Sequence, residues 1–554
     1  MLYSQPLIKS SGLLCLLLAS CIFSLATCDS WVSRASADQQ PIIIDGQFED
    51  WANSSVTHQD PLGDTSALVD FGKLWLADDD EFLFIRIELT FELSATTNNS
   101  IRLFLDTDAD SSTGFSIAGI GAELEWNLGS RFGLVFISGN IESISASDIQ
   151  FRGGPTVTAN EFEFAISKNS IPDGINPLFN GSVIRLAMDN AGGADQIPDQ
   201  GQVLSYQLDV GSLPNEVVIP LERQSVSDLR MMTHNVLFDS PWNPNDRPRF
   251  ERLWSAVAPD ILNLQEINNH SLSETIQLVD DLVPLPSGES WQGAKNSDCA
   301  TVTRFPVVDS WGLSGNLATL IDATSALGSE LLVVNAHLPC CDNDSPRQQE
   351  VDEIMEFIRD AQSPGGILTL SPDTPIVICG DLNLVGFSQQ LNTLLTGDID
   401  NNSQFGPDFQ PDWDGTGLAN LISRQTERRM GYTWRNDNSS FWPGQLDYVI
   451  YSDSVLELGN HYLLYTPEMS DPQSLGFQAN DSLASDHLVF VSDFKAANQV
   501  LHGDVNLDGL INLLDVDPFV ELLSNGSFQA EADINKDGAV NLLDVDGFVL
   551  LLAG

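Results

Sequence analysis

Alternating apolar and polar residues mark the first third of the chain. Residues 82–89, 101–105 and 162–166 alternate in this way, and clusters of Gly, Asn and Asp separate these runs. A period of two places one face of a β-strand in a core and the other in solvent. Short strands at this spacing predict a β-sandwich, which we expect over residues 41–213.

The pattern changes in the second half of the chain. Apolar runs at residues 261–264 and 331–334 alternate with segments of helical spacing, such as residues 347–358. Strands that alternate with helices are typical of an α/β fold. We therefore predict an α/β domain over residues 228–495, which a linker at residues 214–227 joins to the sandwich.

An apolar run near the N-terminus predicts export. Lys9 precedes apolar residues 13–26, which are too few for an ordinary membrane span. Residues 35–37 have the small-x-small form of a cleavage site, so residues 1–37 are expected to be a signal peptide. The sequence before Cys21 also resembles a bacterial lipobox, which leaves a lipid anchor open. We expect a secreted or cell-surface protein with no further membrane span.

Length and charge narrow the function classes. A chain of 554 residues is too long for one hydrophobic core, so several domains are expected. It has 24 Lys and Arg against 78 Asp and Glu, a formal net charge of −54. Such a surface repels nucleic acid at long range and suits the binding of divalent cations.

Four cysteines lie outside the signal region. Export favours disulfides, but four cysteines allow three full pairings that a sequence does not distinguish. Cys379 ends an apolar run, so we expect a buried thiol there. A disulfide from Cys299 to Cys340 or Cys341 is the pairing that we consider.

The end of the chain contains a repeat. Residues 503–509 return in register as residues 532–538. Each copy carries side-chain oxygens at loop positions one, three and five and a glycine at six, as a Ca²⁺ loop needs, with a backbone carbonyl at seven and aspartate at twelve. The predicted calcium ligands are Asp504, Asn506, Asp508, Leu510 and Asp515, and Asp533, Asn535, Asp537, Ala539 and Asp544.

These loops resemble a dockerin, which we expect over residues 502–554 as a small α-helical domain. The resemblance rests on aspartate at position twelve, asparagine at position nine and one following helix per loop. It implies bound Ca²⁺ and a cohesin-type partner. A calcium-stiffened tail without a cohesin is the alternative.

Polar residues follow several apolar strands of the predicted α/β domain. The ends of buried strands are where α/β folds build their sites. These residues are Asn235, Glu266, His337, Asp381, Asn383, Asp447, Asp486 and His487. In this order their segments resemble the endonuclease/exonuclease/phosphatase superfamily, the fold of pancreatic deoxyribonuclease. The resemblance implies a four-layer α/β sandwich and a metal-dependent phosphoester hydrolase.

The chemistry of phosphoester hydrolysis assigns roles to several of these side chains. A divalent cation neutralises the phosphate oxygens, and Mg²⁺ (or Mn²⁺) prefers one or two carboxylates. Glu266 is the foremost expected ligand, with Asn235 beside it and Asp486 as a further ligand. His487 fits a general base, because imidazole titrates near neutral pH, and Asp447 would orient it.

The remaining roles come from the resemblance. It implies that Asp381 positions the water or leaving group, that Asn383 donates to a phosphate oxygen, and that His337 stabilises transition-state charge. Arg304 matches a family position and is expected either to contact phosphate or to be structural. The abasic-site endonuclease branch lacks a histidine at the position of His337, which argues against DNA repair.

The substrate stays open among nucleic acid, phospholipid and sugar phosphate, and between diester and monoester. One alternative is an inactive binding or anchoring protein. Another is an accessory protein of a polysaccharide-degrading assembly, which rests only on the usual company of dockerins. The complete acid/base set favours the enzyme.

The N-terminal sandwich resembles family-9 carbohydrate-binding modules at residues 41–51 and 105–115. The resemblance implies carbohydrate binding, and a structural spacer is the alternative. Asp106, Asp108 and Asp110 are weak calcium candidates. No glycine follows at position six, so an ordinary acidic turn is an equal reading.

Overall fold

The structure is a computed structural model that describes residues 41–65, 69–191, 195–208, 213, 216–497, 502–507, 510–535 and 538–553. The predicted signal peptide, its lipobox cysteine Cys21, and the predicted calcium ligands Asp508 and Asp537 lie outside these residues. Within the described ranges, no helix combines the length and the apolar character needed to cross a membrane.

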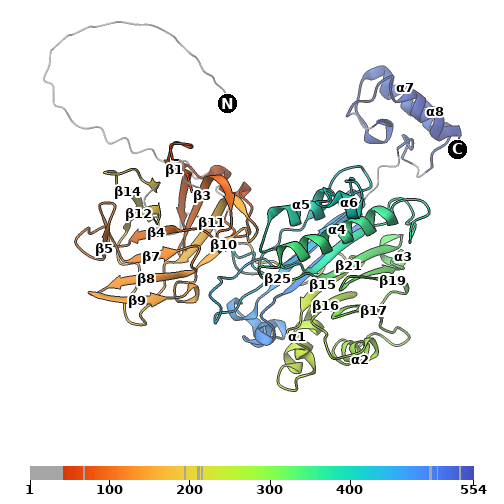
Figure 1. Ribbon diagram of the computed structural model, residues 1–554. Coiled ribbons are helices and arrows are strands. Elements are labelled where there is room, and N and C mark those ends of the chain that lie inside the picture. Colours follow the sequence, from red (N-terminus) through yellow and green to blue (C-terminus); the bar gives the residue numbers. More distant parts are fainter. Residues whose placement is uncertain are drawn as a thin grey trace, which may run out of the picture. The chain divides into compact units, whose positions relative to one another are not determined.

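The N-terminal β region, residues 41–208, contains two antiparallel sheets (Figure 1). The first has the order β1 (Val56–Gln59), β2 (Phe71–Asp78), β3 (Phe82–Leu93), β11 (Ala159–Ser167), β10 (Arg152–Gly154). The second has the order β13 (Gln196–Ile197), β12 (Val183–Asn190), β4 (Ile101–Asp106), β7 (Leu124–Asn127), β8 (Phe132–Ile137), β9 (Asn140–Ile144), with β14 (Leu204–Gln207) paired to β12. A small hairpin joins β5 (Phe115–Ile117) to β6 (Ile120–Ala122).

Both N-terminal sheets contribute to one apolar core. Trp126 of β7 stacks on Phe151 with ring centroids 4.7 Å apart, and Phe151 lies 5.4 Å from the ring of Phe164 of β11. The alternating runs of the sequence supply these inward-facing side chains. The arrangement is consistent with the predicted β-sandwich.

The central region contains two six-stranded sheets. The first has the order β17 (Gln292–Asn296), β18 (Cys299–Thr303), β16 (Ile261–Gln265), β15 (Leu229–Asn235), β26 (Val489–Ala496), β25 (Leu456–Leu464). The second has the order β19 (Val307–Leu313), β20 (Asn316–Ile321), β21 (Leu331–His337), β22 (Ile376–Asp381), β24 (Asp447–Tyr451), β23 (Ala419–Asn420).

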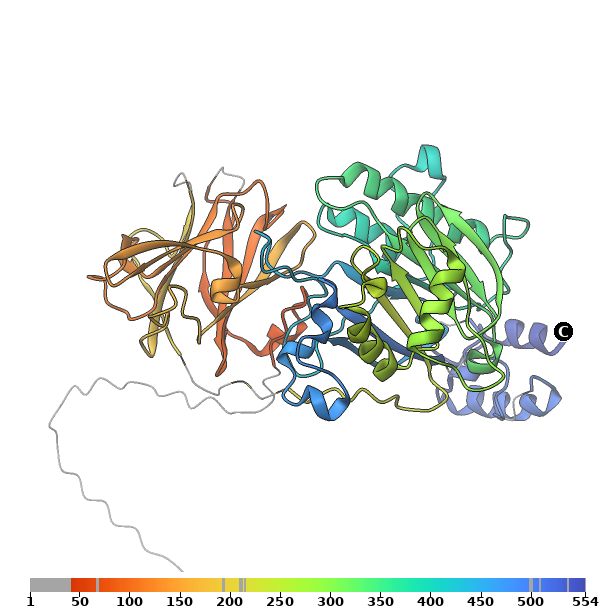
Figure 2. The same cartoon turned by 90° about the horizontal axis from the view of Figure 1, so that it is seen from below.

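Helices cover the outer faces of the central sheets (Figures 1 and 2). One apolar cluster joins α1 (Arg247–Val257) and α2 (Leu272–Leu282) to the first sheet, and another joins α4 (Asp344–Ala361) and α5 (Ser388–Thr396) to the second. Short helices α3 (Thr324–Leu327) and α6 (Asn402–Phe405) lie in the connections. A third cluster holds side chains from both sheets, including Met231 and Val333. These layers match the order helix, sheet, sheet, helix.

The C-terminal module repeats one local structure. Asp515 accepts backbone hydrogen bonds from Asn506 at 3.0 Å and Asn512 at 2.8 Å, and Asp544 accepts the equivalent pair from Asn535 and Asn541. The helices α7 (Val516–Asn525) and α8 (Val545–Ala553) follow the two loops. Phe519 and Phe548 stack between them at 4.0 Å.

The cysteines differ in part from expectation. Cys379 is a buried free thiol, as predicted. The disulfide from Cys299 to Cys340 or Cys341 is wrong, because Cys299 is free and buried in β18 whereas the other two are exposed. The sulfurs of Cys340 and Cys341 instead lie 2.7 Å from each other.

Candidate active site

The strand register brings the predicted polar residues to one edge of the central sheets. His337 at the end of β21 is the partner of Asp381 in β22, and Asp381 is the partner of Asp447 in β24. In the other sheet, Asn235 ends β15, and Glu266 directly follows the parallel strand β16. Parallel neighbours end at the same edge, and the antiparallel strand β24 begins there, so five dispersed residues meet at this edge.

Asn235 bridges the two sheets. Its Nδ2 donates to Glu266 Oε1 and to Asp381 Oδ2, each at 3.0 Å. Glu266 is fixed by the Phe238 amide, which donates to Oε2 at 2.7 Å. Its φ of 65° lies in the left-handed region, where non-glycine residues are rare and often mark functional sites.

These oxygens fit a divalent cation. The carboxylates of Glu266 and Asp381 both accept from Nδ2 of Asn235, whereas Oδ1 of Asn235 accepts from the Leu237 amide at 3.0 Å. Mg²⁺ and Mn²⁺ take such ligands and keep several waters. Glu266 and Asp381 are the neighbouring carboxylates that could hold the ion, and metal binding by Asn235 stays a prediction, because its amide nitrogen faces them.

Two histidines approach the same oxygen of Asp381. Nε2 of His337 lies 3.6 Å and Nε2 of His487 lies 3.5 Å from Asp381 Oδ2. A carboxylate fixes the far side of each ring: Asp298 lies 2.7 Å from Nδ1 of His337, and Asp447 lies 2.8 Å from Nδ1 of His487. The site therefore has two His–Asp pairs that face one shared carboxylate.

The shared carboxylate sets the charge of both rings. Burial lowers the pKa of each imidazole, but the neighbouring carboxylates outweigh burial. The pKa of His337 rises to about 9 through Asp298 and Asp381, and the pKa of His487 rises to about 10 through Asp447 and Asp381. These shifts favour the cationic form of both rings at neutral pH, which suits an anionic substrate.

Two hydroxyl side chains hold this arrangement. Ser485 Oγ donates to the Asn235 carbonyl at 2.7 Å and accepts from the His487 amide at 3.1 Å. Thr433 Oγ1 accepts from the Asp447 amide at 2.8 Å. Each bond ties the backbone of a site residue to a hydroxyl side chain of a neighbouring segment.

Comparison with known families agrees with this geometry. Residues 232–487 match the model of the Endonuclease/Exonuclease/phosphatase family. The chain contains a domain of this family. Residues 502–546 match the dockerin type I domain, so the chain contains this module as well. No curated protein matches the chain.

Solved structures align with the endonuclease/exonuclease/phosphatase domain at low identity. The human Nocturnin catalytic domain covers 50% of this chain and 98% of its own at 17% identity, with a TM-score of 0.33. A family protein from Leptotrichia buccalis covers 48% and 99% at 14% identity, with a TM-score of 0.31. Sphingomyelinase C from Streptomyces griseocarneus covers 48% and 99% at 16% identity, with a TM-score of 0.29.

Two predicted site residues have hydrogen-bond partners outside the cluster of carboxylates and imidazoles. The Asp486 carboxylate accepts from the Trp434 indole at 3.0 Å. Asn383 Nδ2 donates to the Leu338 carbonyl at 3.1 Å. Metal binding by Asp486 and phosphate binding by Asn383 stay predictions.

Arg304 does not lie at the site. Its guanidinium pairs with Asp260 at 3.1 Å and with Glu289. Asp260 precedes β16 whereas Glu266 follows it, so the length of that strand separates Arg304 from the metal ligands. The phosphate contact expected of Arg304 is therefore corrected to the structural role that the sequence also allowed.

Asp298 is the site residue that the sequence did not reveal. It immediately precedes β18, and its carbonyl accepts from the Ile267 amide at 3.0 Å, which places it beside Glu266. The only local signal is a polar residue next to an apolar strand, and many turns share it.

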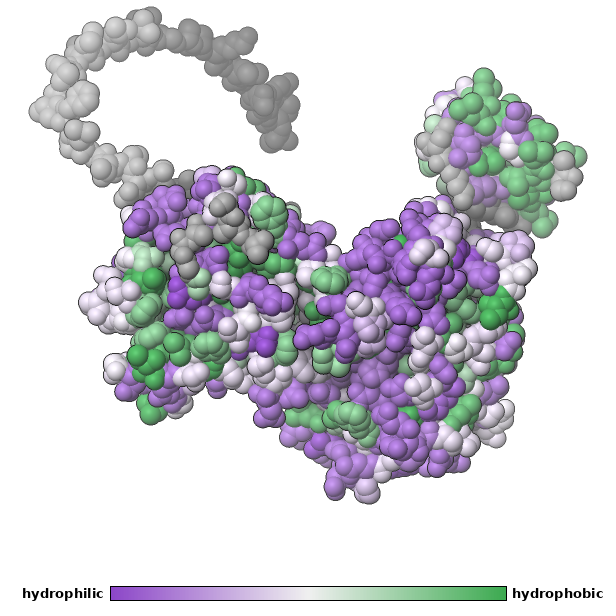
Figure 3. Space-filling view, viewed as in Figure 1, coloured by the Kyte–Doolittle hydropathy of each residue, from purple (hydrophilic) through white to green (hydrophobic). Residues whose placement is uncertain are grey.

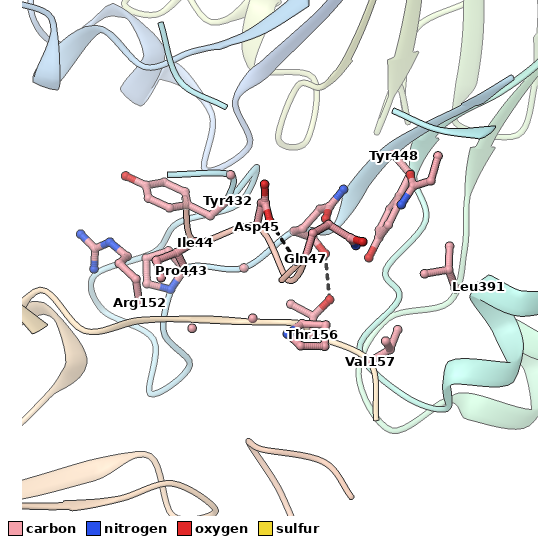
Figure 4. Close-up of a pocket in the computed structure, with 17 residues that line it drawn as sticks. Ile44, Asp45, Gln47, Arg152, Thr156, Val157, Leu391, Tyr432, Pro443 and Tyr448 are labelled. Carbon is pink, nitrogen blue, oxygen red and sulfur yellow. Dashed lines mark hydrogen bonds between the residues drawn. The ribbon is translucent and has the colours of Figure 1, made fainter. Parts of the chain in front are cut away.

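The N-terminal β region borders the loops of the active site. Thr156 Oγ1 lies 2.8 Å from the Leu384 carbonyl and 3.0 Å from the Gln445 carbonyl. These positions neighbour Asn383 and Asp447. Figure 4 shows Thr156 at a small cavity between the two regions. Its volume of about 40 Å³ holds water but not a substrate.

Two of the three weak calcium candidates of the N-terminal region lie together, and the third lies apart from them. Asp106 and Asp108 have carboxylate oxygens within 4.8 Å of each other and of Glu123. Asp110 is not in this group, and its carboxylate accepts from the Ser112 amide in an exposed turn. Glu123 therefore stands where the sequence placed Asp110.

Proposed function

We propose that this chain is an exported, divalent-metal-dependent phosphoester hydrolase. The observation that supports it best is the pair of His–Asp units around Asp381, beside the carboxylate of Glu266. Cationic donors and a cation site that meet at one point suit the anionic oxygens of a phosphoester. A purely structural role would not need two imidazoles aimed at one carboxylate.

The residues divide the work of hydrolysis. A bound Mg²⁺ or Mn²⁺ would supply charge neutralisation at the phosphate. His337, held by Asp298, would donate to a phosphate oxygen and stabilise the charge that develops. His487 would remove a proton from the attacking water, with Asp447 fixing the ring. A base must be neutral first, so this role requires that the bound cation offset the carboxylates that raise the pKa of His487.

The surface favours some substrates over others. The chain has 78 acidic and 24 basic residues, and this charge opposes a long polyanion at low ionic strength. We therefore place phospholipids and small phosphoesters before nucleic acid. A diester and a monoester both fit the residues of the site.

The dockerin would anchor the enzyme outside the cell. Figure 3 shows apolar residues gathered on the C-terminal module. Among them, Leu513 and Leu514 of the first repeat and Leu542 and Leu543 of the second are exposed at equivalent positions. An exposed apolar patch of this kind marks a protein contact, which agrees with a cohesin-type partner.

The test uses the full chain after removal of metals. Turnover of a bis-aryl phosphodiester, an aryl phosphomonoester, sphingomyelin and plasmid DNA would be measured with Mg²⁺, Mn²⁺ or Ca²⁺. We expect metal-dependent turnover that falls about 100- to 10,000-fold in His487→Ala, the range for loss of a general base.

The matched control is His461→Ala. His461 lies on β25, and its partly buried imidazole forms a hydrogen bond with Ser423. This variant should keep its activity. The proposed mechanism would be contradicted if turnover persisted in His487→Ala or if a chelator left turnover unchanged. An absence of turnover on every substrate would favour the binding-protein alternative.

A further inference from the structure

Three carboxylates meet at one edge of the N-terminal β region, and none of them belongs to the candidate active site. Asp60 directly follows β1, Asp64 lies in the next turn, and Asp195 directly precedes β13. One oxygen of each lies within 4.8 Å of the others. The cluster thus joins two loops that are widely separated in the sequence.

Asp60 is a buried carboxylate without hydrogen-bond partners among the described residues. Its side chain is only 2% exposed, and neither carboxylate oxygen has a hydrogen-bond partner among the described residues. Burial of a carboxylate without hydrogen bonds or a counter-charge is strongly unfavourable. Native structures avoid this cost, so the two oxygens require a ligand.

Protein cations do not meet this need within the described residues. No described Lys, Arg or His forms an ion pair with Asp60, Asp64, Asp70 or Asp195. Asp70, which is 1% exposed, has one buried oxygen without a partner among the described residues. Its other oxygen accepts from the Gly63 amide at 2.7 Å and from the Thr90 hydroxyl, and so fixes the turn before Asp64.

A shared proton explains the site less well than a cation does. Burial, followed by the charges of Asp195 and Asp64, raises the pKa of Asp60 to about 7. A protonated Asp60 would still need a donor and an acceptor inside the protein. Asp195 is held in place by amides of Phe71 and Gln196, which donate to its two oxygens at 2.6 and 2.8 Å. Burial raises the pKa of Asp195, and the two amide donors oppose that rise, because they favour the ionised carboxylate.

We propose that Asp60, Asp64 and Asp195 bind a Ca²⁺ ion that ties the loop after β1 to the loop before β13. The ligands are carboxylate oxygens, which select hard cations, and no nitrogen or sulfur donor is among them. Asp64 is exposed, which leaves one side of the ion open to water. Ca²⁺ tolerates such an irregular, partly hydrated set of oxygens better than Mg²⁺ does.

The first test counts bound calcium on the full chain. Calcium at the dockerin is removed by Asp504→Ala and Asp533→Ala, and these substitutions form the background of every variant. After chelation, equilibrium dialysis with elemental analysis gives the calcium bound per chain. We expect Asp60→Asn to lose one ion and Asp64→Asn to bind that ion at least about tenfold more weakly. Asp80→Asn, at an exposed carboxylate between β2 and β3, should change neither value.

Thermal unfolding gives a second readout, because the difference in unfolding temperature between the parent and Asp60→Asn should change sign when calcium is added. In chelator, Asp60→Asn should unfold at or above the temperature of the parent, because it removes like-charge repulsion. With calcium, the parent should become the more stable of the two. Equal calcium stoichiometry in the parent and both site variants would overturn the proposal, and so would an equal calcium-induced shift. Because Asp64 is exposed, Asp64→Asn keeps the test decisive if Asp60→Asn does not fold.

Discussion

Replacing Asp298 by asparagine tests the part of the site that no sequence motif carries. Asp298 lies 2.7 Å from Nδ1 of His337, and the side chains of the two residues are 20% and 22% exposed. A hydrogen bond to a charged group contributes about 1.5–3 kcal/mol. If His337 acts on the transition state, the loss corresponds to a fall of about 10- to 150-fold in kcat.

The equivalent substitution in the pair of Asp447 and His487 should lower activity more. Asp447 is 0% exposed, and its partner His487 is 6% exposed, so water screens that bond less. A carboxylate that orients a general base in this way is worth up to about 10,000-fold in the serine-protease example. We therefore expect the fall in kcat to be at least about tenfold larger in Asp447→Asn than in Asp298→Asn.

Steady-state kinetics on the best substrate of the full chain measure both effects. Asp298→Asn should lower kcat and leave KM within about threefold, because the bond matters most when charge develops on phosphate. Asp309→Asn, at an exposed carboxylate of β19, is the matched control. The reasoning fails if Asp298→Asn retains its kcat while His337→Ala loses activity. That result would mean that His337 needs no orienting carboxylate.

Three further outcomes follow from particular contacts. Thr156→Val removes the hydroxyl between the Leu384 and Gln445 carbonyls, and chemical denaturation should show a loss of about 0.5–1.5 kcal/mol. Arg304 forms ion pairs with Asp260 and Glu289, away from the site. Arg304→Ala should therefore leave KM unchanged within about twofold and destabilise the domain by about 0.2–1 kcal/mol. Chelation with EDTA, followed by its removal, should abolish turnover and make residues 502–554 protease-sensitive, whereas re-addition of Mg²⁺ alone should restore turnover but not protease resistance.

The sequence predicts secondary structure best where its periodicity is strong. The run at residues 82–89 lies within β3, and the helical spacing of residues 347–358 lies within α4. Local patterns determine these elements because each has to bury one face. The meeting of Asp60 with Asp195 has no such pattern, because it depends on how two loops are placed by strands of different sheets.

Strand direction explains why one expected residue is absent from the site and another is unexpectedly present. β18 runs antiparallel to β16, with Ala300 opposite Leu264 and Thr303 opposite Ile261. The end of β18 therefore lies beside the start of β16, which takes Arg304 away from Glu266. The same pairing brings the residue before β18, Asp298, to the edge where β16 ends. A motif gives the position of a residue along its strand, but the direction of the neighbouring strand decides which edge of the sheet that position reaches.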